Sequence, residues 1–194
     1  MALAEEWALE GAVTLIDLDF VNPYFRAQDH RAALERLGVR VVAPDAEVAA
    51  IDAPALPPAA REAIVHPRGS TLVDLGGDPA GAIVIGQFAP MLTEYDCWAV
   101  VNFSRPSTAD PEAACALLRD IATVTRLRIT GLIGNTHLGA YSTAEDVLDG
   151  LEPLRVLAAL LPAPIVLLCA PADLALPAMG LPLLQIHPRL RRPW

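Results

Sequence analysis

Short apolar segments alternate with longer amphipathic segments along nearly the whole chain of 194 residues. The short segments are rich in β-branched residues, and several contain no polar position, which is typical of strands buried on both faces. Parallel strands need crossover connections, and helices supply them. The alternation therefore predicts an α/β fold, a mainly parallel sheet with helices on both faces.

The pattern places the expected elements as follows. Strands are expected at 12–18, 39–43, 70–75, 97–103, 129–135, 164–169 and 183–186. Helices are expected at 2–10, 27–37, 111–125 and 143–160, with weaker patterns at 59–65 and 79–88. The segment 44–58 is expected to be a crossing loop, and 171–182 a proline-broken connection. Because this length fits one domain, we expect 1–194 to form a single α/β domain.

Three helix ends carry specific local signals. Asp110, Pro111 and Glu112 offer an N-cap, a proline in the first turn and an early acid. The sequence Ser-Thr-Ala-Glu at 142–145 predicts a capping box that begins at Ser142. Gly38 is expected to end the helix at 27–37.

Charge and hydropathy restrict the partners of the chain. A net charge of −9 and a pI of about 4.8 predict no nucleic-acid partner, because phosphate neutralisation needs a basic face. The mean hydropathy is +0.40, but the charge-free stretch 156–172 is too short for a spanning helix and is broken by three prolines, so we expect no membrane span. The amino terminus has no basic segment typical of a secretory signal, which favours the cytoplasm.

The three cysteines predict no disulfide framework or metal site. Cys97, Cys115 and Cys169 are odd in number and show no Cys-x-x-Cys spacing. Each lies in an apolar context. We expect small buried side chains in a reducing compartment.

Polar residues stand where three expected strands end. Asp17 and Asp19 close the first strand, Asp74 closes another and is followed by Gly76 and Gly77, and Asn135 closes a third. Open α/β sheets bind ligands at the carboxyl ends of their strands, so we expect these groups to share one crevice. A single aspartate at a strand end can equally be a helix cap or a turn former.

Two enzyme classes that use an Asp pair fit poorly. Leu15–Val21 matches the first motif of a haloacid-dehalogenase-like phosphatase, with Asp17 as nucleophile, but the chain offers no later acidic pair at the right spacing and no lysine to balance the phosphoryl charge. A response-regulator receiver would need a phospho-accepting aspartate, such as Asp74, and a lysine. All 14 basic residues are arginine, so we disfavour both classes.

A third interpretation, a resemblance to a family of nucleotide-binding proteins, extends over nearly the whole chain. The segments 14–26, 39–44, 73–78, 100–106 and 131–146 resemble successive landmarks of bacterial P-loop ATPases of the MinD/ParA/CobQ-like (SIMIBI) group. The most specific part of the likeness is a strand ending in Asp-x-Asp followed by Asn-Pro-Tyr-Phe-Arg at 22–26. The resemblance implies a nucleotide-binding α/β domain that uses ATP and Mg²⁺.

The resemblance also implies roles for individual residues. In such a domain Asp19 would position or activate the attacking water, Asp17 would lie near the Mg²⁺ shell, and Asp74 would hold Mg²⁺ through water. Gly76 and Gly77 would belong to the switch II segment. Asn135 would read the adenine edge, with the turn from Pro171 to Asp173 close to the base.

The chain departs from this group in one decisive feature. It contains no lysine and no Gly-x-x-x-x-Gly-[Lys/Arg]-[Ser/Thr] loop, the element that wraps the phosphates. The likeness begins inside the helix that follows this loop, so we expect either a start codon placed too late, which we favour, or a genuine loss. The full-length product would be a Mg²⁺-dependent ATPase, a dimer-forming switch or a partner of a client protein. The chain itself is expected not to hydrolyse ATP, and the rival function is a non-enzymatic binding module.

The same likeness predicts a consequence for the sheet. The strand that precedes the P-loop in that group lies between the strands matching 70–75 and 97–103. Its absence should make these two strands pair directly or leave a groove between them, with poor stability in either case.

Overall fold

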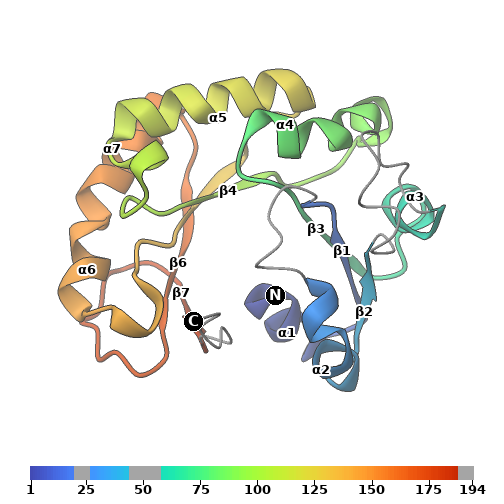
Figure 1. Ribbon diagram of the computed structural model, residues 1–194, viewed down its shortest axis with the longest axis horizontal. Coiled ribbons are helices and arrows are strands. Elements are labelled where there is room, and N and C mark those ends of the chain that lie inside the picture. The colour runs from blue at the N-terminus through green and yellow to red at the C-terminus, as the bar shows by residue number, and fades with distance from the viewer. Residues whose placement is uncertain (20–26, 44–57, 188–194) are drawn as a thin grey trace. The chain divides into compact units, whose positions relative to one another are not determined.

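The computed structural model describes residues 1–19, 27–43 and 58–187 of the chain (Figure 1). The chain divides into two compact units: Met1–Glu94 with Val124–Arg126, and Tyr95–Thr123 with Leu127–Trp194. Each unit contains one parallel sheet with helices around it, which confirms the α/β class. Whether the units act as one domain remains a prediction, and the crossing loop expected at 44–58 lies almost wholly outside the described residues.

The sheet of the first unit has the strand order β2-β1-β3. Its strands are β1 (Val13–Asp17), β2 (Val39–Val42) and β3 (Ser70–Asp74), and both neighbours of β1 run parallel to it. All five residues of β1 are buried, as expected for a central strand.

Helices cover both faces of this sheet (Figure 1). On one face α1 (Ala2–Ala8) and α2 (Arg31–Arg36) share a core with residues of β1 and β2; its buried members are Ala4, Val13, Leu15, Ala27, Leu34, Val39 and Val41. The opposite face carries α3 (Pro58–Val65), where the hydroxyl of Thr71 donates to the carbonyl of Ala63 at 3.2 Å. Successive side chains of a strand point to opposite faces of the sheet. α1 and α2 therefore lie on one face and α3 on the other.

Helical segments of the first unit are shorter than the sequence predicts. The expected helix at 27–37 is a 3₁₀ turn, η1 (Ala27–His30), followed by α2, and Gly38 ends it with a φ of +86° as predicted. The expected helix at 79–88 is α4 (Pro79–Ala82) followed by the 3₁₀ segment η2 (Ile83–Gln87), and η3 (Ala89–Met91) comes next.

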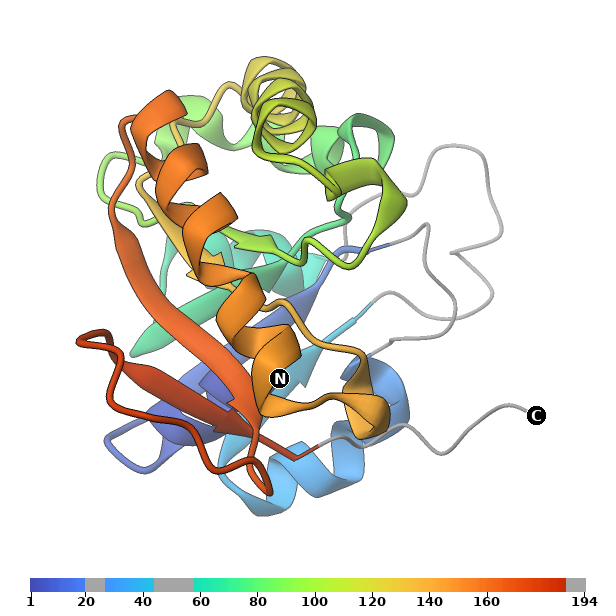
Figure 2. The same cartoon turned by 90° about the vertical axis from the view of Figure 1, so that its left-hand side faces the viewer.

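The sheet of the second unit has the strand order β4-β5-β6-β7, again all parallel. Its strands are β4 (Trp98–Val101), β5 (Gly131–Gly134), β6 (Ile165–Pro171) and β7 (Leu183–Ile186). Its longest helices are α5 (Pro111–Thr125) and α7 (Leu151–Leu160), and Figure 2 shows α7 running alongside β6. The buried core joins both helices to β4, β5 and β6; it consists of Ala99, Val101, Ala114, Cys115, Leu118, Leu132, Leu154, Leu157, Ala163 and Leu168.

The helix predicted at 143–160 is two helices, α6 (Ala144–Asp149) and α7, which meet at Gly150. The predicted capping box is also shifted by one residue: Thr143, not Ser142, is the N-cap, and Asp146, not Glu145, closes the box. Ser142 instead accepts from the backbone N–H of Leu138 and donates to the carbonyl of Gly139, each at 2.7 Å. The start of α5 is as predicted, because Asp110 accepts from the N–H of Ala113 at 2.8 Å.

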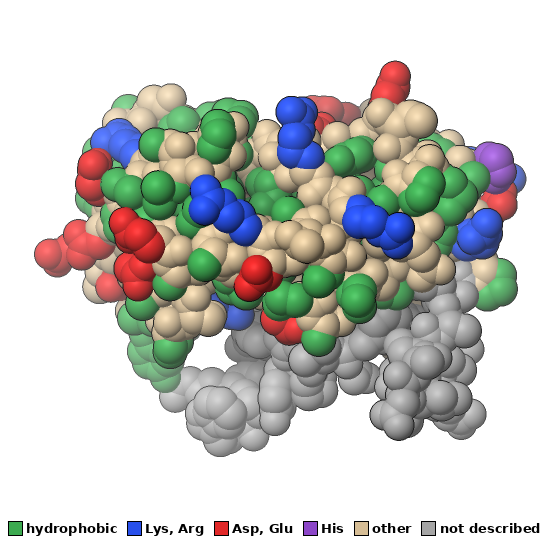
Figure 3. Space-filling model, turned by 90° about the horizontal axis from the view of Figure 1, so that it is seen from above, with side chains coloured by type: hydrophobic (Ala, Val, Ile, Leu, Met, Phe, Trp, Pro, Cys, Tyr) green, Lys and Arg blue, Asp and Glu red, His purple; other side chains and the backbone are tan. Residues whose placement is uncertain are grey.

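The remaining connections are short: η4 (Pro106–Thr108) follows β4 and η5 (Gly139–Tyr141) follows β5. Within the described ranges β3 pairs only with β1 and β4 only with β5, and the expectation that the two strands either pair directly or flank a groove remains a prediction. No helix within 1–19, 27–43 and 58–187 is long and apolar enough to cross a membrane. Figure 3 shows acidic, arginine and apolar side chains interspersed on the face it displays.

The three cysteines are free thiols. Cys115 and Cys169 are buried as predicted, but Cys97 is only half-buried. Burial raises the pKa of the Cys169 thiol to about 11 and also raises that of Cys97. Thiols with raised pKa values are poor nucleophiles, so these two behave as structural side chains.

Candidate functional site

The eight site residues predicted from the sequence fall into two groups, one in each unit. Asp17, Asp19, Asp74, Gly76 and Gly77 belong to the first unit, and Asn135, Pro171 and Asp173 to the second. A crevice shared by both groups remains a prediction.

Two carboxylates of the first group are neighbours in the sheet. Asp17 ends β1, Asp74 ends β3, and the two residues are paired in the parallel register. Paired residues of adjacent strands point to the same face, so both side chains lie at the same edge and on the same side of the sheet. The ladder continues one step further, because the N–H of Leu18 donates to the carbonyl of Asp74 at 2.8 Å.

Asp17 organises the backbone at this edge. Its Oδ2 accepts a buried hydrogen bond of 2.7 Å from the N–H of Ala27, and its Oδ1 accepts one of 3.2 Å from the N–H of Asp19. Only 5% of the residue is exposed. The carboxylate therefore ties the start of η1 to the end of β1.

The pKa of Asp74 is raised by its surroundings at this edge of the sheet. Desolvation raises its pKa, the negative charges of Asp17 and Asp19 raise it further, and the positive amino terminus partly opposes the shift. The residue nevertheless remains solvent exposed as a whole. A bound cation would offset the repulsion between Asp74 and the carboxylates of Asp17 and Asp19. Mg²⁺ would therefore reverse the part of the Asp74 pKa shift that this repulsion causes.

Gly76 and Gly77 differ in what the fold requires of them. A Cβ on Gly76 would lie 2.8 Å from the Cα of Gly81 and 3.4 Å from Oδ1 of Asp19, so close packing excludes a side chain there. A Cβ on Gly77 would meet nothing within 4 Å. The pair is followed by Asp78, whose Oδ1 caps α4 by accepting from the N–H of Gly81 at 2.9 Å. Gly76 thus brings the turn after β3 against Asp19.

In the second unit a hydrogen-bonded cluster forms where β4 and β5 end. The N–H of Gly139 donates to Nδ1 of His137 at 3.0 Å, so Nδ1 is the unprotonated nitrogen of the neutral ring. Nε2 then carries the hydrogen and donates to Oδ1 of Asn135 at 3.1 Å. Desolvation lowers the pKa of His137, and the charge of Arg105 lowers it further, which favours this neutral tautomer.

Asn135 keeps donor capacity in this arrangement. Its amide oxygen accepts from His137, and its backbone N–H donates to the carbonyl of Val101 at 2.7 Å. Within the described part of the chain its amide NH₂ group has no partner. Asn135 can therefore donate to a ring nitrogen or carbonyl of a ligand, whereas accepting from an exocyclic amino group would compete with His137.

Asn102 fixes the two strand ends to each other. Its Nδ2 donates to the carbonyl of His137 at 3.0 Å, and its Oδ1 accepts from the N–H of Ser104 at 2.9 Å. Next to it, Thr136 accepts from the N–H of Phe103 at 3.2 Å through its hydroxyl. The sequence pattern gave no role to Asn102 or His137. The signal that could have revealed them is their position, Asn102 directly after β4 and His137 three residues after the end of β5.

Pro171 and Asp173 lie at the end of β6. Pro171 is the buried last residue of the strand, Asp173 is exposed, and a turn between them is closed by the N–H of Leu174, which donates to the carbonyl of Pro171 at 3.1 Å. Because β6 neighbours β5, this turn follows the strand beside the one that carries Asn135. Its closeness to a bound base remains a prediction.

The acidic group fits only part of what Mg²⁺-ATP requires. Mg²⁺ is commonly held by one or two carboxylates together with waters and substrate phosphates, which Asp74 and Asp17 could supply. No group of three or more His, Cys, Asp or Glu side chains in 1–19, 27–43 and 58–187 could hold a metal ion. The phosphates themselves have no lysine and no Gly-rich loop to bind them. The carboxylates of Asp17 and Asp74 could therefore bind a cation that is already bound to phosphate, but they provide no group that binds the phosphate itself.

Comparison with known proteins adds no assignment: no protein-family model matches the chain, and no curated protein matches it.

Proposed function

We propose that this chain is the α/β domain of a cytoplasmic Mg²⁺-ATP-dependent switch related to the P-loop ATPases of the MinD/ParA/CobQ-like group, and that it does not hydrolyse ATP by itself. The observation that carries the proposal is the register pair of Asp17 and Asp74 at the carboxyl ends of two adjacent parallel strands. Ligands of open α/β sheets bind at this end, and the repulsion at Asp74 favours a cation there.

The proposal gives each residue a role that its surroundings permit. Asp74, solvent exposed and with a raised pKa, would hold Mg²⁺ through water, while Asp17 would shape the backbone around the metal. Asp19, close to Gly76, would orient the attacking water in a complete enzyme. Asn135 would donate to the base through its amide NH₂ group.

The proposed domain does not hydrolyse ATP, because it lacks the groups that bind the phosphates. Phosphoryl transfer depends on positioning the phosphates and neutralising the charge that develops on them. Lysine and the Gly-rich loop, which do this in P-loop enzymes, do not occur in the sequence.

The second candidate is a binding module that uses no nucleotide, as a homodimer or with a client protein. Asp17 favours it, since both of its carboxylate oxygens serve the backbone and would do so without any ligand. Titration of the chain with ATP distinguishes the two candidates.

The test is isothermal titration of the full chain with ATP in Mg²⁺ and in EDTA. We expect weak, Mg²⁺-dependent binding that becomes roughly tenfold weaker in Asp74→Asn, a loss of about 1.4 kcal/mol. Asp120→Asn, an exposed aspartate on α5, is the matched control and should bind like the wild type. Absence of binding at millimolar ATP would support the binding module, and turnover by the purified chain would contradict the proposal.

A further inference from the structure

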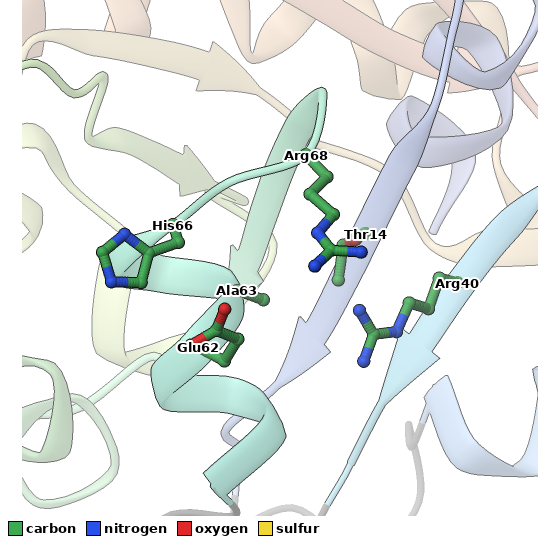
Figure 4. A pocket seen from close by; sticks show the side chains of 6 residues that line it. All are labelled: Thr14, Arg40, Glu62, Ala63, His66 and Arg68. Atoms are coloured by element: carbon green, nitrogen blue, oxygen red, sulfur yellow. The ribbon is translucent and has the colours of Figure 1, made fainter.

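A pocket of about 170 Å³ opens in the first unit and contains a pair of arginines (Figure 4). It is lined by Thr14, Arg40, Glu62, Ala63, His66 and Arg68. Thr14 comes from β1, Arg40 from β2, Glu62 and Ala63 from α3, and the other two from the turn between α3 and β3. Three parts of the chain that are distant in sequence, β1, β2 and α3 with the turn that follows it, therefore build one polar site.

Thr14 supplies an unused hydrogen-bonding group at this site. The residue is 6% exposed, yet its hydroxyl has no partner within the described residues and is not sealed from the pocket. Buried hydroxyls normally make a hydrogen bond, since leaving one unpaired costs about 1 to 3 kcal/mol. The equivalent position on β3, Thr71, does so by donating to Ala63. The hydroxyl of Thr14 opens to the pocket and is therefore available to a ligand there.

Two arginines extend into the same pocket as Thr14. Figure 4 shows the side chain of Arg68 reaching over Thr14 and that of Arg40 extending from β2 into the space beside it. Neither forms an ion pair with a described residue, and this includes Glu62, which lines the same pocket. Both arginines are exposed to solvent, and their guanidinium groups match the geometry of phosphate oxygens, so an anion in the pocket can bind both of them.

This pocket is separate from the acidic group at the end of β1. Positions 14 and 17 differ by three, so their side chains point to opposite faces of the sheet. Thr14 shares its face with α3, whereas the core residues Val13 and Leu15 share theirs with α1 and α2. Arg68 also precedes β3, while Asp74 ends it. The basic pocket therefore lies near the amino ends of the strands, away from the carboxylates.

The geometry points to a binding site for a small phosphate-bearing anion in this pocket, held by the guanidinium groups of Arg40 and Arg68 and by the hydroxyl of Thr14. The volume lies below the roughly 300 to 1,000 Å³ of ordinary small-molecule pockets, so it suits a phosphate group and not a whole nucleotide. The carboxylate of Glu62 can accept from a hydroxyl of the ligand, either that of hydrogen phosphate or that of an attached polyol.

The test uses the full chain and inorganic phosphate. Thermal melts are recorded in phosphate and in chloride at matched ionic strength, and phosphate should raise the midpoint more than chloride because a ligand that binds only the folded state stabilises it. Glycerol 3-phosphate is the second probe: a larger rise with the ester identifies a phosphomonoester as the ligand, and an equal rise identifies the free ion. Equal midpoints in chloride and in both phosphate probes would overturn the site.

Substitutions assign any response to this pocket. Arg40→Gln, Arg68→Gln and Thr14→Val should each weaken phosphate binding, the arginine variants by roughly tenfold or more, as expected for loss of a hydrogen bond to a charged group. Arg36→Gln on α2, whose guanidinium binds the carbonyl of Ala32, is the control that should keep the response, and Asp74→Asn should keep it as well. A response retained in either arginine variant or in Thr14→Val would overturn the assignment.

A second measurement does not depend on the folding of variants. In the wild-type protein the Nε–Hε resonances of Arg40 and Arg68 should shift on titration with phosphate, while that of Arg36 should not. Shifts confined to other arginines would also overturn the proposal.

Discussion

The carboxyl group of Asp74 shares the end of the first sheet with Asp17 and Asp19. Desolvation and these two charges raise its pKa, so the folded protein holds the Asp74 proton more tightly than the unfolded chain does. The charged form therefore costs stability above the folded-state pKa, and this cost disappears as the pH falls below the unfolded value of about 3.9.

Asp74→Asn should consequently stabilise the protein at pH 7 and lose this advantage below about pH 4. For an exposed residue we expect a rise of the melting midpoint on the order of 1–2 °C. Melts of wild type and variant between pH 3 and pH 8 measure it, with Asp120→Asn as the control that should show no such dependence. A variant less stable than wild type at pH 7 would mean that the Asp74 carboxylate is stabilised by its surroundings.

Gly76 and Gly77 form a matched pair for testing the packing of the turn after β3. In Gly76→Ala the new methyl group meets backbone atoms of Gly81 at 2.8 and 3.1 Å, and neither atom belongs to a flexible side chain. We expect a loss of about 1 to 3 kcal/mol in the free energy of unfolding by urea. Gly77→Ala has open space and should be neutral or stabilising by up to about 1 kcal/mol. Equal effects of both variants would show that the turn does not pack against Gly81.

At the residue scale the sequence predicted positions better than roles. The alternation of apolar segments places Asp17 and Asp74 correctly at strand ends, because parallel strands order their ends in space. It does not reveal that both oxygens of Asp17 serve the backbone, or that His137 occupies the amide oxygen of Asn135. These contacts depend on loop conformations that local pattern does not encode.

The capping box at the start of α6 uses Thr143 and Asp146, one residue later than the sequence predicts. The hydroxyl of Thr143 accepts from the N–H of Asp146, and Oδ2 of Asp146 accepts from the N–H of Thr143 at 2.7 Å. Oδ2 of Asp146 also accepts from the hydroxyl of Thr143 at 2.8 Å, and the two hydrogen bonds that this carboxylate accepts, from the backbone and from the hydroxyl of Thr143, lower the pKa of Asp146. Its contribution to stability is thus present above the unfolded pKa and is lost as the pH falls through the lower folded value.

Thr143→Ala should reduce the free energy of unfolding by about 1 kcal/mol, the usual cost of losing an N-cap. Asp146→Asn should also destabilise at pH 7, with the difference from wild type shrinking in acid. Glu145→Gln is the matched control at the position that the sequence favoured, and it should have little effect. Urea titrations at pH 7 measure all three, and a larger effect at Glu145 than at Asp146 would restore the box predicted from the sequence.

At the scale of elements, strands were more predictable than helices. Each strand lies within its expected segment or extends two residues beyond it, because buried strands are continuous apolar runs. The helix expected at 143–160 is divided at Gly150, where a Cβ would lie 2.5 Å from side-chain atoms of Thr136. That approach joins residues far apart in sequence, so the periodicity of the segment gives no sign of it. Likewise, the capping box is ambiguous in sequence because Ser142 and Thr143 both favour N-cap positions.

The whole molecule consists of two units that each hold about half of the chain and have separate cores. The class of fold was predictable, since alternating strands and helices leave few arrangements other than parallel sheets. The division into two sheets was not, because sequence pattern does not say which strands pair. In the described ranges β3 and β4 each have one strand neighbour in their own sheet, so each is an edge strand of that sheet.

Open edges and small cores together predict a chain of low stability. A small unit buries a smaller fraction of its surface than a large domain, and the margin of a whole domain is only about 5 to 15 kcal/mol. Edge strands also offer a template for pairing between molecules, so heated protein should aggregate instead of refolding. We therefore expect a broad, poorly reversible transition, with a midpoint below about 65 °C, the upper end for ordinary mesophile domains. Circular dichroism melting with simultaneous light scattering measures both properties, and a sharp, reversible transition well above that temperature would show that both sheets are complete as they stand.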